Sequence, residues 1–313
     1  MAYSDRRGAR ADRRREAWMN EQIDEFTADL KRQEVAVKTV ANYLSDLDCF
    51  ARWFNQTTGD EFAAANITPT DIRDYRSYLQ TNQGRTPATI NRRLAALRRF
   101  FLWAIGAGVT SGNPATIVKG VQSVLRGPRS LEKREVDKLI RMAEKDATDG
   151  PGRRNLAILV TLRHTGLRVG ELCDLLLADV PISERKGSVT VRSGKGGKHR
   201  VVPLNLDARK AISEYLAVRP KVADEHIFIG QRGEGLKPQG VELIVGKYSR
   251  LAGLENVTPH VLRHSFAKHA LDTGTDLVAL ARLLGHARLD TTARYTQPTE
   301  RDLERAVERL ETA

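Results

Sequence analysis

Apolar residues recur every three or four positions through the first hundred residues, a spacing that places them on one face of a helix. A first helix is predicted from about Trp18 to Leu30. The clearest apolar stripe follows it and is widened by Tyr43 and Phe50. Its members are Val40, Leu44, Leu47, Ala51 and Phe54.

Two further helices open on residues that commonly begin a helix. Thr68 and Pro69 precede a pattern of apolar residues that includes Ile72 and Leu79, and Pro87 precedes a longer stripe. The members of that stripe are Ile90, Leu94, Leu97, Phe101 and Ile105. Four amphipathic helices are enough for a small bundle, so residues 17–107 are predicted to form a helical domain.

The pattern changes after the fourth helix. Glycine and proline punctuate residues 108–128, where the apolar periodicity weakens, and we interpret this segment as an interdomain linker. Helical patterns then resume, interrupted by two short runs of alternating β-branched residues, 189–192 and 200–204, around a glycine-rich turn. This combination predicts a mixed α+β domain with a small antiparallel sheet over residues 129–297.

Basic residues exceed acidic ones by 51 to 39, a net charge of +12 that favours a polyanionic partner such as DNA. Four arginines, Arg92, Arg93, Arg98 and Arg99, surround the apolar stripe of the fourth helix. They suit a surface that follows a DNA groove, although a solvated helix face would have the same composition. Residues 1–16 contain six further arginines and read as a flexible basic tail, which either touches phosphates or is simply solvated.

Several classes of protein are disfavoured by what the sequence lacks. No apolar run approaches 18 residues and the N-terminus has no apolar signal region, so a cytoplasmic, nucleoid-associated protein without a membrane partner is expected. The two cysteines, Cys49 and Cys173, are expected to be free thiols. No zinc-ligand spacing, carboxylate cluster or Walker-type loop is present, so no metal and no cofactor are expected.

The candidate chemistry lies in short polar segments of the second half. His260 and Arg263 are three residues apart in a helical pattern that opens at Pro259, so both should project from one face. Leu262 and Phe266 lie on the opposite face, toward a core. A polar pair in that position could project into a cleft and bind an anion.

The ordered set of polar residues resembles the signature of the tyrosine recombinase (lambda-integrase-like) family, most closely its Xer-type and integrase members. The signature is two arginines, a hairpin lysine, two histidines and a tyrosine, which here are Arg168, Lys195, His260, Arg263, His286 and Tyr295. The resemblance covers nearly the whole chain and is strongest from about residue 155 to 297.

The resemblance implies a role for each member of the set. Arg168 and Arg263 would bind the non-bridging oxygens of a scissile phosphate, as the planar guanidinium does well. Tyr295 would be the nucleophile, with His260 as its general base. His286 would hydrogen-bond the phosphate or order the site.

The same family roles extend to the hairpin and to supporting residues. Lys195 would be the general acid that protonates the leaving 5′-hydroxyl, although a shift of the hairpin could exchange it with Lys198. Glu171 is expected to orient Arg168 from three residues away, and His264 is placed with it in a supporting position. Lys198 and Arg200 join the four arginines of the fourth helix as expected DNA contacts.

The family also implies an architecture. A helical core-binding (SAM-like) domain and the mixed α+β catalytic domain would form a C-shaped clamp around double-stranded DNA, with four protomers assembled across two recombination sites. Residues 298–313 carry an apolar stripe of Leu303, Ala306, Val307 and Leu310. We expect this short helix to exchange onto a neighbouring protomer, while the alternative is that it folds back on its own domain.

The sequence therefore predicts a site-specific recombinase that joins DNA through a 3′-phosphotyrosyl intermediate. The resolution of dimers and the integration or excision of an element remain equally open as its role, as does a heteromeric recombinase partner. The rival hypotheses are a type IB topoisomerase-like enzyme, a catalytically silent DNA-binding accessory protein, and a transcriptional regulator.

Overall fold

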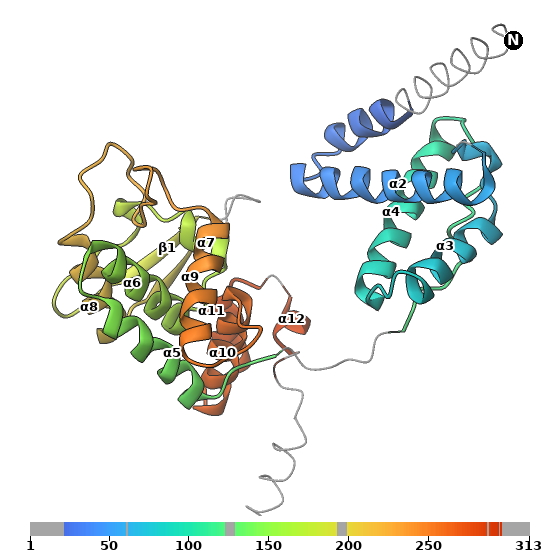
Figure 1. Ribbon diagram of the computed structural model, residues 1–313. Coiled ribbons are helices and arrows are strands. Elements are labelled where there is room, and N and C mark those ends of the chain that lie inside the picture. Colours follow the sequence, from blue (N-terminus) through green and yellow to red (C-terminus); the bar gives the residue numbers. More distant parts are fainter. Residues whose placement is uncertain are drawn as a thin grey trace, which may run out of the picture. The chain divides into compact units, whose positions relative to one another are not determined.

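The computed structural model describes residues 22–60, 62–122, 129–192, 199–286, 288–293 and 295 (Figure 1). The chain divides into two compact units, Met1–Leu125 and Arg126–Ala313. The tail predicted at residues 1–16 and the exchange helix predicted at residues 298–313 lie outside the described residues.

The first unit is helical, as its apolar periodicity predicts. A helix over residues 22–32 precedes α2 (Val37–Thr58), the short η1 (Ala64–Asn66), α3 (Pro69–Thr81) and α4 (Pro87–Gly106). Helix α4 packs against both α2 and α3. The core between them is rich in aromatic side chains, and its fully buried members include Phe26, Phe50, Tyr75, Phe100 and Phe101.

Side-chain caps explain where α3 and α4 begin. The hydroxyl of Thr68 accepts a hydrogen bond from the Asp71 N–H at 3.3 Å, and the Asp71 carboxylate accepts one from the Thr68 N–H at 2.8 Å. Thr86 caps α4 in the same way through the Thr89 N–H. These bonds satisfy N–H groups that have no partner within the helix, which is why a threonine before a proline predicts a helix start.

Part of the segment predicted as a linker belongs to the first unit. Ala115 and Val118 are buried in its core, and their carbonyls accept hydrogen bonds from Arg98 at 3.1 and 2.6 Å. Asn91 binds both the N–H and the carbonyl of Val121. The packed chain therefore extends beyond residue 108, and the boundary between the units falls after Leu125.

The second unit is a mixed α+β domain, as predicted. Its helices are α5 (Lys133–Asp146), α6 (Gly150–Thr165), α7 (Val169–Cys173), α8 (Leu206–Leu216), α9 (Pro238–Leu251), α10 (Pro259–Asp272), α11 (Leu277–Leu284) and α12 (Leu289–Ala293), with the short η2 at Leu177–Asp179. Helix α6 lies at the centre and contacts α5, α8, α9 and α10. It buries almost every side chain from Ala157 to Leu162, which makes it the core of this unit.

The predicted hairpin is confirmed. Strand β1 (Ser188–Arg192) pairs antiparallel with β2 (His199–Pro203), with Val189 opposite Val202 and Val191 opposite Arg200. Val189, Val191 and Val202 face the core, so Arg200, which alternates with Val202 and lies opposite Val191, is on the buried face as well. The turn at residues 193–198, with Lys195 and Lys198, lies outside the described residues.

Two glycines end helices where neighbouring side chains leave no room for a Cβ. Gly166 ends α6 with φ +61°, and a Cβ there would overlap the ring of Phe266. Gly285 ends α11 with φ +65°, and a Cβ would lie 2.7 Å from Nη1 of Arg200. Both positions combine a left-handed backbone with a close approach, so both require glycine.

Within the described ranges, no helix is long and apolar enough to cross a membrane. The same part of the chain contains no group of three or more His, Cys, Asp or Glu side chains arranged to hold a metal ion.

Candidate active site

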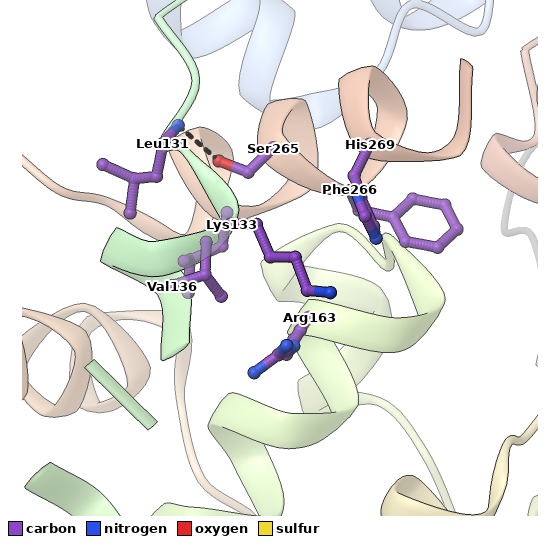
Figure 2. Close-up of a pocket in the computed structure, with 8 residues that line it drawn as sticks. Leu131, Lys133, Val136, Arg163, Ser265, Phe266 and His269 are labelled. Atoms are coloured by element: carbon purple, nitrogen blue, oxygen red, sulfur yellow. Dashed lines mark hydrogen bonds between the residues drawn. The ribbon is translucent and has the colours of Figure 1, made fainter. Parts of the chain in front are cut away.

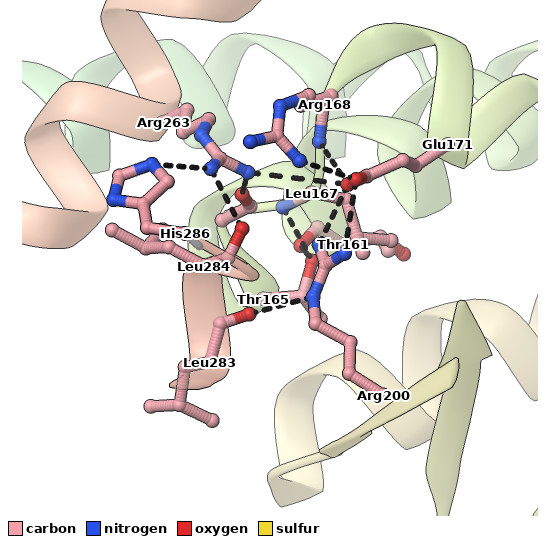
Figure 3. Close-up of polar contacts among 11 residues, drawn as sticks. Thr161, Thr165, Leu167, Arg168, Glu171, Arg200, Arg263, Leu283, Leu284 and His286 are labelled. Atoms are coloured by element: carbon pink, nitrogen blue, oxygen red, sulfur yellow. Dashed lines mark hydrogen bonds and ion pairs between the residues drawn. The ribbon is translucent and has the colours of Figure 1, made fainter. Parts of the chain in front are cut away.

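Glu171, in the first turn of α7, binds two arginines through its carboxylate (Figure 3). Arg168 donates to Oε1 of Glu171 at 2.7 Å from Nη1 and to Oε2 at 2.8 Å from its backbone N–H. Arg200 makes a two-pronged pair with the same carboxylate, at 2.9 and 2.6 Å. The structure thus joins Arg168 to Glu171, as their spacing predicts, and adds Arg200 from strand β2.

The carboxylate of Glu171 is ionised in this setting. Burial alone would raise its pKa, but the hydrogen bonds from Arg200 and Arg168 and the charge of Arg200 outweigh burial and lower the pKa to about 2. A permanently charged carboxylate can hold the two guanidiniums in place, and Arg168 keeps 45% of its side chain exposed beside it. Arg168 is therefore presented to solvent in a fixed orientation.

Arg200, in strand β2, connects this strand to α7 and α11 by hydrogen bonds. Its Nε donates to the carbonyl of Leu283 at 2.9 Å, near the end of α11, while its terminal nitrogens bind Glu171 of α7. Only 14% of its side chain is exposed. Each guanidinium nitrogen of Arg200 is thus bound within the second unit, at a residue that the sequence predicts as a DNA contact.

Arg263 lies deeper than Arg168, with 2% of its side chain exposed. It donates to the carbonyl of Gly166 at 2.5 Å from Nη1 and to that of Leu284 at 2.8 Å from Nη2. Burial and the charge of Arg168 lower its pKa to about 10, which still leaves it cationic at neutral pH. The second arginine thus supplies fixed positive charge from within the protein (Figure 3).

His286 follows α11 and bridges Arg263 to α12. Its Nε2 lies 3.0 Å from Nη2 of Arg263, and its Nδ1 lies 2.8 Å from the hydroxyl of Thr292. Burial and the neighbouring charges of Arg263 and Arg168 lower its pKa to about 4. The ring is consequently neutral near pH 7.

Tyr295 places its hydroxyl beside a histidine. The hydroxyl lies 2.8 Å from Nδ1 of His264, and the phenol ring is stacked 6.4 Å from the ring of His286. The ring of His264 in turn contacts that of His260 edge to face, 4.6 Å between centroids. Both histidines come from α10, so one helix brings His260, His264 and Arg263 toward the tyrosine.

The role of His264 as the direct partner of Tyr295 was not apparent from the sequence, which marked it only as supporting. Its position four residues after His260 was the available signal, because this spacing stacks two side chains on one helix face. His260 itself is exposed and reaches the tyrosine region through the His264 ring. No local pattern could have revealed the contact with Thr292, which depends on how α11 and α12 meet.

The arginines of α4 are engaged within the first unit. Arg92 and Arg93 form ion pairs with Asp46, whose side chain is 3% exposed, and Arg93 also donates to the hydroxyl of Tyr75 at 3.0 Å. Arg98 holds the two carbonyls described above, and Arg99 binds Gln33. Arg92 is exposed, with 47% of its side chain accessible, whereas Arg93, Arg98 and Arg99 are half-buried.

A separate hollow lies on the other face of α10 (Figure 2). It is lined by Val136, Arg163 and Phe266, together with His269, which is exposed. Ser265 accepts a hydrogen bond from the Leu131 N–H at 2.7 Å beside it. This contact ties the start of the second unit to α10, on the face away from the polar cluster.

The cluster brings guanidiniums that suit a phosphate together with a phenol that could act as a nucleophile. Two guanidiniums in fixed orientations can bind the oxygens of a phosphate and stabilise the charge that develops on it during substitution. A neutral histidine and a phenol lie against them. The negative charge of Glu171 is balanced by the two arginines that bind it.

Comparison with known proteins assigns the chain to a family. Residues 129–301 match the phage integrase family, and residues 23–108 match the phage integrase N-terminal SAM-like domain. The chain belongs to the phage integrase family. It is a tyrosine recombinase, a site-specific recombinase and DNA strand-transferase of a class that needs neither ATP nor metal.

Individual relatives agree with this assignment. The tyrosine recombinase XerC of Roseiflexus sp. (strain RS-1) is 34% identical over 288 residues, covering 89% of each chain. The XerH site-specific recombinase bound to palindromic difH substrate has a TM-score of 0.75 at 23% identity, covering 91% of this chain and 85% of that one. A lambda integrase tetramer bound to a Holliday junction has a TM-score of 0.68 at 21% identity, covering 86% and 77%. The latter two show the shared fold.

Proposed function

We propose that Tyr295 attacks a backbone phosphate at a specific site in duplex DNA. The phenol oxygen forms a bond to phosphorus, the bond to the 5′-oxygen breaks, and the DNA 3′ end remains attached to the tyrosine. The phenol proton passes to a base and the leaving 5′-oxygen receives a proton. Attack by the 5′-hydroxyl of a partner strand reverses the step and joins the two duplexes.

The observation that carries this proposal is the shared location of the nucleophile and the arginine cluster. The phenol ring stacks on His286, and His286 binds Arg263. A phosphate bound at the arginines would therefore lie next to the segment that carries Tyr295. The reacting groups need this proximity because holding them together removes much of the entropic barrier.

We assign the phosphate contacts to Arg168 and Arg263. Arg168 is exposed enough to bind an oxygen directly, and the buried charge of Arg263 acts in a setting that water screens weakly. Glu171 fixes Arg168, and Arg200 fixes Glu171. His286 orders the inner edge of this pocket.

We assign the proton transfers to His260 and Lys195. His260 is the proposed base, and His264 holds the hydroxyl of Tyr295 in the DNA-free protein. Lys195 is the proposed acid for the leaving 5′-oxygen, with Lys198 as the alternative in the same turn. The family signature supports these two assignments. The turn that carries both lysines lies outside the described residues.

We further propose that the two units clamp double-stranded DNA and that four protomers assemble across two sites. The similarity to lambda integrase, whose tetramer binds a Holliday junction, supports this assembly. The segment 298–313 would dock on a neighbouring protomer. Among the arginines of α4, Arg92 is the strongest candidate for a DNA contact, because nearly half of its side chain is exposed.

The decisive experiment traps the covalent intermediate. DNA bound by the protein in cells is recovered and sequenced to find the site, and a duplex nicked within that site is then incubated with purified protein. Wild type should form a protein–DNA adduct on a denaturing gel, and Tyr295→Phe should form none. Tyr78→Phe, which removes a hydroxyl that binds Gln83 in the other unit, is the control and should form it normally. An adduct that persists in Tyr295→Phe would refute the assignment of the nucleophile.

A further inference from the structure

Thr292 links His286, which lies beside the arginine cluster, to the segment that carries Tyr295. It lies in α12, three residues before Tyr295, and is completely buried. Its hydroxyl is 2.8 Å from Nδ1 of His286, and its carbonyl accepts a hydrogen bond from the Tyr295 N–H at 3.0 Å. One small residue therefore contacts both the ring of His286 and the backbone of Tyr295.

The chemistry of the partners determines the direction of the hydrogen bonds at His286. A guanidinium can only donate, so Nη2 of Arg263 must donate to Nε2 of the ring, 3.0 Å away. A neutral imidazole with an accepting Nε2 carries its proton on Nδ1. The Nδ1–H then donates a hydrogen bond to the hydroxyl of Thr292. The low pKa of His286, about 4 because of burial and the nearby arginines, agrees with a neutral ring.

We propose that Thr292 is a positioning residue for recombination, whose hydroxyl fixes the tautomer and orientation of His286 and couples them to the backbone of Tyr295. The effect on catalysis rests on the proposed function, whereas the hydrogen bond and the tautomer do not. The coupling means that a displacement of α12 shifts His286 as well, so the pocket and the nucleophile move together.

The hydroxyl is essential to this arrangement, and the shape of the side chain is not sufficient. Valine would fill the same volume but deprive the Nδ1–H of the half-buried His286 of its acceptor, which raises the free energy of this arrangement. The alternative tautomer would turn an N–H of His286 toward the N–H of Arg263, which is unfavourable as well. Serine would keep the acceptor and lose only a methyl group.

The tautomer can be measured directly in the DNA-free protein. The full-length chain is labelled with ¹⁵N-histidine, and the ring nitrogens are observed by multiple-bond ¹⁵N–¹H NMR at pH 7, with His286 assigned by the signals missing from His286→Gln. We expect a protonated Nδ1 and an unprotonated Nε2 in wild type and in Thr292→Ser, and a mixture of tautomers in Thr292→Val. A wild-type ring protonated on Nε2 would overturn the inference without recourse to any variant.

The catalytic consequence is measured with the nicked duplex that traps the wild-type adduct. Thr292→Val should slow adduct formation by about ten- to one-hundred-fold, the range expected when a buried donor loses its partner, while Thr292→Ser should stay within a few-fold of wild type. Thr291→Val is the matched control, since Thr291 is exposed and adjacent, and it should have little effect.

The outcomes separate this inference from the proposed function. If wild type forms the adduct and Thr292→Val forms it equally fast, the inference is wrong and the function stands. If wild type forms no adduct at a verified binding site while His286 has the expected tautomer, the proposed function is wrong and the positioning of His286 by Thr292 stands. Thermal unfolding of each variant shows whether a lower rate is caused by loss of the fold. In that case, the tautomer of His286 in the wild-type protein decides whether the inference stands.

Discussion

The hydroxyl of Tyr295 lies 2.8 Å from Nδ1 of His264, and the ring of His264 in turn contacts that of His260 edge to face. The two histidines should therefore contribute differently to adduct formation. His264→Ala removes one hydrogen bond that holds the nucleophile, and we expect the rate to fall by about ten-fold. His260→Ala removes the proposed general base, and we expect a loss of about a hundred-fold or more.

Both rates are measured on the nicked duplex under single-turnover conditions. His269→Ala is the control, because His269 is an exposed histidine of the same helix on the face away from the cluster. A larger loss in His264→Ala than in His260→Ala would reverse the two assignments and make His264 the base.

Glu171 should stabilise the second unit in a way that depends on pH. Its folded-state pKa of about 2 is below the ordinary value of 4.5, so its contribution is fully present above pH 4.5 and is lost as the pH falls toward 2. A shift of this size corresponds to about 3 kcal/mol of unfolding free energy. Glu171→Gln should lose that stability at pH 7, and the gap to wild type should narrow as the pH falls below 4.5.

Unfolding in urea is monitored by hydrogen exchange in peptides from α6. Fluorescence would not serve, because all three tryptophans lie in the first 103 residues and report only on the other unit. Glu144→Gln, at an exposed carboxylate of α5, is the control and should track wild type. A gap between wild type and Glu171→Gln that stays constant from pH 6 to pH 3 would contradict the assigned shift.

Gly285 should be needed for more than its backbone conformation. Gly285→Ala introduces a methyl group 2.7 Å from Nη1 of Arg200, so it should disturb the pair between Arg200 and Glu171 as well as strain the backbone. Gly274→Ala is the matched control, because Gly274 also has a positive φ, +91°, but a Cβ there meets nothing within 4 Å.

Both glycine variants should lower the thermal stability of the second unit, since alanine is strained at positive φ by about 1 kcal/mol. Only Gly285→Ala should also slow adduct formation, by about ten-fold, because it displaces the residues that orient Arg168. Equal adduct rates in the two variants would show that the close approach to Arg200 is unimportant.

Much of the fold follows from local patterns in the sequence. Thr68 and Thr86 predict helix starts because each satisfies backbone N–H groups within its own turn. The alternating β-branched residues of β1 predict a strand, because successive side chains of a strand point to opposite faces and only one face is buried. The three-residue spacing of His260 and Arg263 places both on one face of a helix, because residues three apart in a helix are neighbours.

The contacts that assemble the site were less accessible. Arg200 is predicted as a DNA contact, yet its alternation with Val202 places it on the inner face of the hairpin. Its partner Glu171 is far away in the sequence, as is the carbonyl of Leu283. Pairings of this kind depend on how elements pack, and a reading of local periodicity cannot supply them.

Arg98 illustrates the same limit and leads to a test in the first unit. The sequence placed it among the DNA contacts of α4, but its guanidinium holds the carbonyls of Ala115 and Val118 and so secures the segment that follows the helix. Arg98→Ala should lower the unfolding free energy of this unit by about 1–3 kcal/mol, because two buried carbonyls lose their donor. Trp53 lies in its core, Trp103 packs against that core, and both report the transition by fluorescence.

The control is Arg73→Ala, which removes an exposed arginine of α3 that binds Thr70 and should change stability by less than about 0.5 kcal/mol. Affinity for the recovered DNA site, measured at several salt concentrations, provides the second readout. Loss of a phosphate contact would lower the salt dependence by about one counterion, whereas a structural role leaves the slope unchanged at temperatures where the variant is folded. An Arg98→Ala variant with wild-type stability and a reduced slope would restore Arg98 to the DNA interface.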